Sequence, residues 1–285
     1  MAPMHRPEGS SELEADDRAG VELPSEPLRD PAELFGLRGR RAVVTGASSG
    51  IGRRAALVLA MAGAQVLTVA RRGERLQALA ASQPQLAQRL LPLPLDLSRA
   101  GAAEQLAERA QQELGGCDIL VAAAAVPGRM ASAALQSARF NQVLQLNVTL
   151  QAELAANLFP ALRASGAGRV IHVASIYGLR GQETGELAPY VASKHALVGL
   201  TRSQAIEWAA EGITVNALAP GHFPTEMTAA LLADAGIAAR LRQRYPIGRF
   251  GRLEELDTAL LFLASPASSF VTGIVLPVDG GWTSR

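Results

Sequence analysis

A tyrosine and a lysine stand four positions apart, at Tyr190 and Lys194, in a segment with helical apolar spacing. Side chains at this separation share one face of a helix. The ammonium group favours the phenolate, so the pair predicts a lowered tyrosine pKa and a general acid/base. Ser175 follows the apolar run 170–174, at the strand edge where open α/β sheets bind ligands. Taken alone, the pair also fits a helix surface without function, so its interpretation depends on the surrounding elements.

A glycine-rich loop, residues 45–52 (TGASSGIG), follows the first apolar run and opens the first expected helix. Gly46 permits a tight turn, Gly50 lets the backbone approach a pyrophosphate, and Gly52 lets the helix pack closely on the strand. The free N–H groups and the dipole at the start of the helix attract an anion. An ordinary glycine-rich turn is the alternative, but the flanking strand and helix favour a dinucleotide-binding loop.

The second apolar run ends at Ala70, which Arg71 and Arg72 follow. An acidic residue at this place would hold the ribose 2′-hydroxyl of NAD, whereas a guanidinium binds a 2′-phosphate through charge-assisted hydrogen bonds. Arginines that only face solvent are the alternative, but the missing acid argues against NAD in either case. We therefore predict NADP(H) as the cofactor.

Apolar runs alternate with helix-period segments from residue 41 onward. This alternation predicts an α/β fold, with one Rossmann-type, doubly wound parallel sheet covered on both faces. The segment of about 222–247 is rich in Ala, Leu and Arg and is expected to form a small helical lid. The expected helices are 53–62, 101–114, 140–164, 190–211 and 253–263, and the expected strands include 42–44, 66–69, 119–121, 170–173 and 273–278.

Bulk composition argues against several classes of protein. The formal net charge of +1 gives no reason to expect nucleic acid, and we see neither a membrane-spanning run nor a secretory signal. A lone Cys117 and four scattered histidines provide no disulfide and no metal-ligand spacing, so we expect a metal-free cytoplasmic protein. Residues 1–33 hold nine acids, three arginines and five prolines, which predicts a disordered acidic tail, or alternatively a docking arm, before a single catalytic domain 34–285.

Over residues 34–285 the chain resembles the short-chain dehydrogenase/reductase family. The resemblance rests on the loop 45–52, Asn147, Ser175, the Tyr190/Lys194 pair, and Pro220-Gly221 followed by Thr225. It implies that Tyr190 exchanges a proton with the substrate, Ser175 hydrogen-bonds the carbonyl oxygen, Lys194 holds the nicotinamide ribose and tunes Tyr190, and Asn147 orders a proton-relay water. The expected cofactor-binding residues are Gly46, Ser48, Ser49, Gly50, Ile51, Gly52, Arg71, Arg72, Asp96, Leu97, Ala124, Tyr190, Lys194, Pro220, Gly221, Phe223 and Thr225.

Three features depart from the family pattern. Residues 122–125 read Ala-Ala-Ala-Ala where the family usually has Asn-Asn-Ala-Gly, which removes amides that would tie the sheet together. Ser175 and Tyr190 are 15 positions apart (190 − 175), more than is usual, which enlarges the loop 178–188. Ser49 occupies a position that is often basic in NADP-preferring relatives. If the resemblance is set aside, the alternative for Asp96 is a turn residue at a strand end, and the alternative for Asn147 is an asparagine within a helix.

The resemblance implies an oxidoreductase that moves a hydride between NADP(H) and a carbonyl or secondary alcohol, in a homotetramer built partly through the helices 140–164 and 190–211. It covers members acting on 3-oxoacyl chains and on gluconate-type sugar acids, and a thioester, a small ketone or a keto-sugar acid all stay open. An NADP(H)-binding sensor or scaffold without turnover is the alternative. The expected substrate-lining residues are Arg129, Met130, Ile176, Tyr177, Leu179, Arg180, Gln182, Glu183, His222, Phe223 and Met227, with packing as the alternative for Phe223, Met227 and Trp282.

Overall fold

The computed structural model describes residues 28, 30–182 and 185–284. Within them, seven parallel strands form one sheet in the order β3-β2-β1-β4-β5-β6-β7. The order reverses between β1 and β4, which creates a crevice at the carboxyl ends of the strands. The predicted doubly wound α/β fold is confirmed. The strands are β1 (Arg41–Thr45), β2 (Gln65–Ala70), β3 (Leu90–Pro94), β4 (Ile119–Ala122), β5 (Arg169–Val173), β6 (Thr214–Pro220) and β7 (Val275–Val278).

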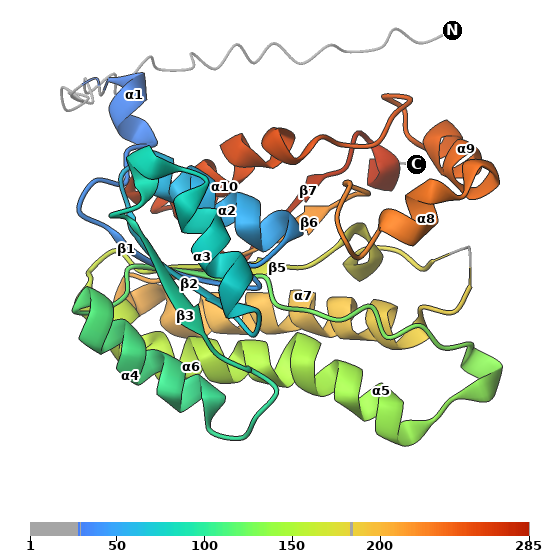
Figure 1. Ribbon diagram of the computed structural model, residues 1–285, viewed down its shortest axis with the longest axis horizontal. Coiled ribbons are helices and arrows are strands. Elements are labelled where there is room, and N and C mark those ends of the chain that lie inside the picture. The colour runs from blue at the N-terminus through green and yellow to red at the C-terminus, as the bar shows by residue number, and fades with distance from the viewer. Residues whose placement is uncertain (1–27, 29, 183–184, 285) are drawn as a thin grey trace, which may run out of the picture.

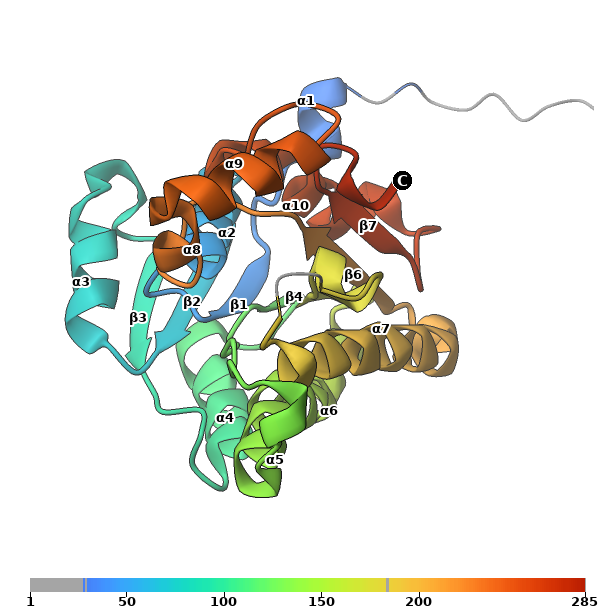
Figure 2. The ribbon, with the colours of Figure 1, turned by 90° about the vertical axis from the view of Figure 1, so that its right-hand side faces the viewer.

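Helices cover both faces of the sheet (Figures 1 and 2). Alternate strand residues enter two separate cores, because successive side chains of a strand point to opposite faces. Val43 packs in one core, and its neighbours Ala42 and Val44 pack in the other. Burial on both faces explains why these strands read as continuous apolar runs. One face carries α2 (Gly50–Met61), α3 (Gly73–Ala81) and α10 (Asp257–Ala264), and the other carries α4 (Ala102–Leu114), α6 (Leu150–Ala164) and α7 (Ala188–Trp208).

The helix expected over 140–164 is interrupted. Helix α5 (Ser137–Leu144) leads into a π-helical turn, Gln145–Thr149, before α6 begins. In this turn the N–H of Leu150 bonds the carbonyl of Gln145, five residues back. The widened turn carries Asn147, whose side chain is completely buried. The prediction of one uninterrupted helix was wrong because a single widened turn leaves the spacing of apolar residues in the sequence almost unchanged.

Other element boundaries differ by a few residues from those expected. Helix α2 begins at Gly50 and α7 at Ala188, and a 3₁₀ turn precedes α10. The segment predicted as a small helical lid is helical, and it contains α8 (Ala229–Ala233) and α9 (Ala235–Arg244). Helix α1 (Pro31–Leu34) takes in the last residues of the expected tail, whereas residues 1–27 and 29 of that tail lie outside the described part. None of the described helices is long and apolar enough to span a membrane.

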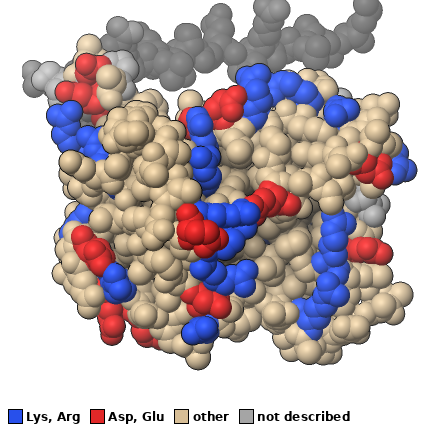
Figure 3. All heavy atoms as spheres, viewed as in Figure 1, with Lys and Arg blue, Asp and Glu red and all other residues tan. Residues whose placement is uncertain are grey.

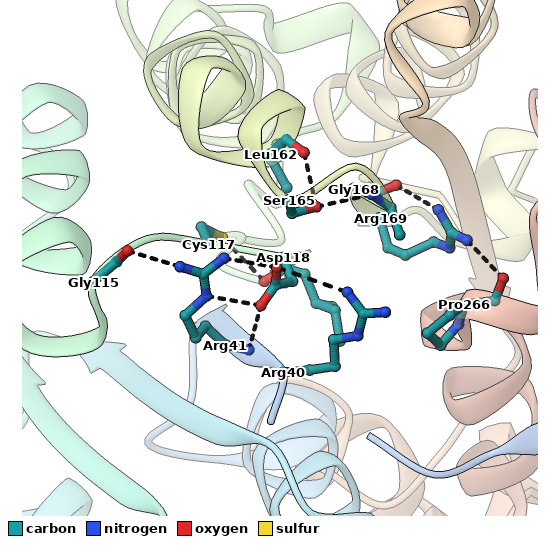
Figure 4. A network of polar contacts seen from close by, with 12 residues as sticks. Arg40, Arg41, Gly115, Cys117, Asp118, Leu162, Ser165, Gly168, Arg169 and Pro266 are labelled. Atoms are coloured by element: carbon teal, nitrogen blue, oxygen red, sulfur yellow. Dashed lines mark hydrogen bonds and ion pairs between the residues drawn. The ribbon is translucent and has the colours of Figure 1, made fainter. Parts of the chain in front are cut away.

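An ion cluster joins the amino-terminal ends of the central strands (Figure 4). Asp118, which is 3% exposed, accepts hydrogen bonds from the backbone N (2.7 Å), Nε (2.9 Å) and Nη2 (2.8 Å) of Arg41. Arg40 lies 3.9 Å from the same carboxylate, and the buried Arg169 donates to three backbone carbonyls nearby. Burial alone would raise the pKa of Asp118, but the bonds from Arg41 outweigh it and leave this pKa lowered. Burial raises the pKa of the adjacent Cys117 thiol to about 12.

Candidate active site

A cleft of about 540 Å³ runs along the carboxyl ends of the strands, under the lid. This volume lies within the range of ~300–1,000 Å³ that is typical of ligand sites. Every residue expected to bind the cofactor lines the cleft, and so do Ser175 and Met227. Asn147 does not line it, although it was expected to act in catalysis. The glycine loop, the ends of β2 and β3, the alanine run and the segment after β6 thus meet around one cavity.

The glycine loop is shaped by close backbone approaches. Gly46 has a φ of +68°, and a Cβ there would lie 3.0 Å from the backbone N of Ala124. A Cβ on Gly52 would lie 2.5 Å from the carbonyl oxygen of Gly46, so only glycine lets α2 start this close to the strand. Ser49 precedes α2 without a side-chain cap bond. The first N–H groups of α2 therefore have no side-chain cap, which fits an anionic group such as a pyrophosphate.

The alanine run is held by two side chains from elsewhere in the chain. Thr45 Oγ1 accepts hydrogen bonds from the backbone N–H groups of Ala123 (3.0 Å) and Ala124 (3.1 Å). From the other side, Gln151 Nε2 donates to the carbonyl of Ala124 at 2.7 Å. These bonds tie the run to β1 and α6 in the absence of its own side-chain amides. Neither side chain was predicted, because nothing in the sequence marks a contact across 78 or 27 positions.

Arg72, one of the two arginines expected to bind a 2′-phosphate, contacts the glycine loop. Its Nη2 lies 2.9 Å from Ser48 Oγ and 3.1 Å from Ser49 Oγ. Arg71 lines the cleft as well, but its side chain is exposed and lies near Asp96. Hydrogen bonds from Ser98 to Asp96, with Arg71 in support, lower the pKa of Asp96. Asp96 is therefore both a turn residue and a cleft residue.

Ser175, Tyr190 and Lys194 meet at one end of the cleft. The Ser175 hydroxyl hydrogen-bonds Tyr190 and also accepts the N–H of Tyr177 at 3.1 Å. Lys194 Nζ donates to the carbonyl of Val173 at 2.7 Å and stands 5.5 Å from the centre of the Tyr190 ring. The spacing of four residues thus places both groups beside the end of β5.

The pKa of the tyrosine shifts in the opposite direction to the sequence prediction. Burial raises the pKa of Tyr190 to about 12, although the bond from Ser175 lowers it in part. Burial also lowers the pKa of Lys194 to about 7, since the charged amine is removed from water. The prediction was wrong for the protein alone because it counted the neighbouring charge and not the desolvation of both groups.

Asn147 lies outside the cleft and joins two of the segments that form it. Its Oδ1 accepts the N–H of Val126 at 2.9 Å, and its Nδ2 donates to the Val126 carbonyl and to Ser193 Oγ, both at 3.0 Å. Val126 lines the cleft, and Ser193 precedes Lys194 in α7. The amide therefore connects the cleft wall to the helix that carries the Tyr/Lys pair. An asparagine without a structural role would not make these three hydrogen bonds. Its expected proton-relay water stays a prediction.

A buried aromatic cluster lies beneath the lid. Tyr177 Oη is 3.2 Å from His222 Nε2, and His222 Nδ1 is 2.6 Å from Tyr245 Oη. Burial lowers the pKa of His222 to about 4, so the imidazole is neutral near pH 7. Trp282, 6% exposed, packs on both His222 and Tyr245 and does not line the cleft, as the packing alternative for this residue predicts. Of the other substrate-lining candidates, Phe223 and Met227 line the cleft, Glu183 lies outside the described residues, and Arg129, Met130, Ile176, Tyr177, Leu179, Arg180, Gln182 and His222 do not line it.

Comparisons with known proteins match the part of the chain that forms this cleft. A family model described as enoyl-(acyl carrier protein) reductase matches residues 46–283, which contain all but the first residue of the glycine loop, the Tyr/Lys pair and the lid. The chain is 39% identical over 246 residues to a cis-4-hydroxycyclohexanecarboxylate dehydrogenase from Sinomonas cyclohexanicum, an alignment that covers 86% of this chain and 97% of that one. It is 36% identical over 257 residues to a 2-dehydro-3-deoxy-D-gluconate 5-dehydrogenase from Escherichia coli (strain K12), covering 88% and 98%.

Solved structures match over a similar part of the chain. A gluconate 5-dehydrogenase from Burkholderia cenocepacia J2315, crystallised in complex with NADP and tartrate, matches with a TM-score of 0.84 and 34% identity. The match covers 90% of this chain and 100% of that one. The similarity therefore extends over the whole sheet and both helical layers.

Proposed function

The chain belongs to the short-chain dehydrogenase/reductase family of NAD(P)-dependent oxidoreductases that act on alcohol and carbonyl groups, and we propose that it transfers a hydride between NADP(H) and a small secondary alcohol or its ketone. The observation that carries this proposal is the convergence of Ser175, Tyr190 and Lys194 in the same cleft as the uncapped start of α2. Proton-transfer groups and an anion-binding helix end then serve one bound cofactor and substrate.

When bound, the nicotinamide supplies or accepts the hydride, and the residues of this chain hold and move the proton. Because Ser175 hydrogen-bonds Tyr190, both hydroxyls can reach the same substrate oxygen. Tyr190 donates its proton to that oxygen during reduction and accepts it during oxidation. A tyrosine pKa of about 12 is far from neutral, so Tyr190 needs a nearby cation to exchange protons efficiently. The protonated form of Lys194 is such a cation, and its pKa of about 7 leaves only part of the amine charged near neutral pH. The same side chain would hold the ribose of a bound nicotinamide.

We assign the preference for NADP(H) to Arg72, supported by Arg71 and by Ala70 at the end of β2. The Arg72 guanidinium lies on Ser48 and Ser49, and its Nη1 group, which is directed away from these serines, could form a charge-assisted bond with a 2′-phosphate. Fluorescence titration of the purified protein with NADPH and NADH tests this assignment, and NADPH should bind at least about tenfold more tightly. Arg72→Ala should abolish most of that difference. Equal affinities for the two cofactors in the unaltered protein would refute the assignment.

For the substrate, we propose a secondary alcohol in a small molecule that also carries a carboxylate. Both relatives named above act, by their names, on such acids, one cyclic and one a sugar acid. Oxidation of NADPH with a panel of cyclic keto acids, keto-sugar acids and 3-oxoacyl thioesters tests the proposal. Turnover limited to the thioesters would overturn it. Tight NADPH binding with no turnover across the panel would instead favour the sensor or scaffold.

The alternative of a sensor rested on the alanine run and the acidic tail. Because Thr45 and Gln151 hold the alanine run in place, that run gives no reason to expect a defective site.

We further propose that the enzyme acts in the cytoplasm as a homotetramer built partly through α6 and α7. The exposed side of α7 carries small residues such as Ala192, Ala196 and Gly199, which suit close helix packing between subunits. Light scattering would measure the mass of the assembly, and a monomer would refute the tetramer.

A further inference from the structure

One acidic residue of the lid segment reaches across the cofactor cleft. Glu226 directly follows Thr225, and its carboxylate lies 2.9 Å from Arg72 Nη1 and also pairs with Arg75 of α3. Glu226 lines the cleft. In Figure 3, basic and acidic side chains gather at the middle of this face, between α3 and the lid. The guanidinium that contacts the glycine loop is therefore already paired with an anion.

A 2′-phosphate would need the same donors. Nε and Nη2 of Arg72 hydrogen-bond the two loop serines. The remaining nitrogen, Nη1, bonds Glu226 and would be the donor that a phosphate could use. A phosphate carries about 1.5 to 2 negative charges and three acceptor oxygens, and it competes well with one carboxylate for an arginine. Glu226 is half exposed, so its ion pairs hold it only weakly. The phosphate and this carboxylate then repel each other across one guanidinium.

The backbone next to Glu226 is better fixed than its side chain. The N–H of Thr225 bonds Thr228 Oγ1 at 3.0 Å, and the same hydroxyl bonds the Phe223 carbonyl at 2.5 Å. A Cβ on Gly50 would lie 3.1 Å from the Thr225 side chain, so this segment is packed against the glycine loop. The backbone of Glu226 therefore stays beside the glycine loop and Arg72 even when its carboxylate turns away.

From this geometry we propose that Glu226 is a specificity-determining residue that weakens NADP(H) binding, because its carboxylate occupies the guanidinium groups of Arg72 and Arg75 that a 2′-phosphate would need. The proposal rests on the NADP(H) preference proposed above. Two such anions about 5 Å apart in water repel each other enough to change an affinity about tenfold at low salt. Most of the effect should appear in the dissociation rate of NADP(H).

Titration of the full chain with NADPH and NADH, followed by nicotinamide fluorescence, tests the proposal. Glu226→Gln keeps the side-chain shape and removes the charge, so NADPH should bind about tenfold more tightly in low salt and NADH should change less than twofold. The gain should fall to about threefold in 0.5 M NaCl, since salt screens exposed charges. Glu74→Gln is the matched control, because Glu74 is an exposed acid in the first turn of α3 and does not line the cleft. It should change neither affinity more than twofold.

Three results would overturn the proposal. Weaker or unchanged NADPH binding by Glu226→Gln would mean that the carboxylate orients Arg72 instead of competing with the phosphate. An equal gain with Glu74→Gln would mean that only the local net charge matters, and an equal gain with NADH would mean that the 2′-phosphate is not involved. A failure of the proposed function is seen separately, as equal NADPH and NADH affinities in the unaltered protein.

Discussion

Replacing Asp118 by asparagine should destabilise the fold without touching the cleft. Asp118 is the acceptor for three nitrogens of Arg41, and Arg40 lies close to the same carboxylate. Asparagine keeps one acceptor oxygen but leaves the guanidiniums of this cluster without an anion. Breaking a buried ion pair costs about 3–5 kcal/mol, and because the Arg41 side chain is 29% exposed, we expect about 2–3 kcal/mol here. The Tm should fall by roughly 4–10 °C.

The loss should depend on pH in a defined direction. Arg41 holds the pKa of Asp118 below its ordinary value of 3.8, so the carboxylate stabilises the folded protein fully above that value. This contribution is lost as the pH falls through the folded-state pKa. In urea unfolding curves, the difference between the two proteins should therefore be constant from pH 8 to about 5 and should shrink below about pH 4.

Asp257 provides the matched control. It accepts two hydrogen bonds from Arg54 in a similar arrangement, but both side chains are more exposed than Asp118, at 33% and 23%. Asp257→Asn should cost only about 0.5–1 kcal/mol. Equal losses for the two variants, or a loss for Asp118→Asn that persists at pH 3, would refute the reasoning. NADPH affinity should be unchanged in Asp118→Asn, because the cluster lies at the strand ends opposite the cleft.

Three further changes test other parts of the structure. Tyr190→Phe should reduce turnover about 10²–10⁴-fold with little change in NADPH affinity, and undiminished turnover would exclude Tyr190 as the general acid/base. Gln151→Met should lower the free energy of unfolding by about 1 kcal/mol, because the Ala124 carbonyl loses its donor, and an unchanged urea midpoint would contradict this. Glu186 has a φ of +64°, so Glu186→Gly should raise the Tm slightly whereas Glu186→Val should lower it, and the reverse order would contradict the strain.

The sequence predicts the sheet and the cleft well because their signals are local. Apolar runs, a glycine loop between strand and helix, and a Tyr/Lys pair four apart each specify structure within about ten residues. Contacts between distant segments carry no such signal. Thr45 and Gln151 beneath the alanine run, and Glu226 beside Arg72, join positions that only the fold brings together. The tyrosine pKa was mispredicted for the same reason, since desolvation depends on everything packed around the group.

The π-helical turn shows how one extra residue changes the direction in which a helix presents a side chain. A regular helix over 140–164 would keep its interior positions at a spacing of 3.6 residues, whereas the widened turn presents the Asn147 amide to Val126 and Ser193.

The buried position of Cys117 allows the opening of the central sheet to be measured by cysteine alkylation. It is the single cysteine of the chain, its side chain is completely buried, and its pKa of about 12 leaves almost no thiolate at neutral pH. The thiolate, not the neutral thiol, is the nucleophile that reacts with alkylating reagents. Alkylation should therefore proceed no faster than the start of β4 separates from its neighbours, and the rate of modification would measure the opening of the central sheet in unaltered protein, including in a cell extract.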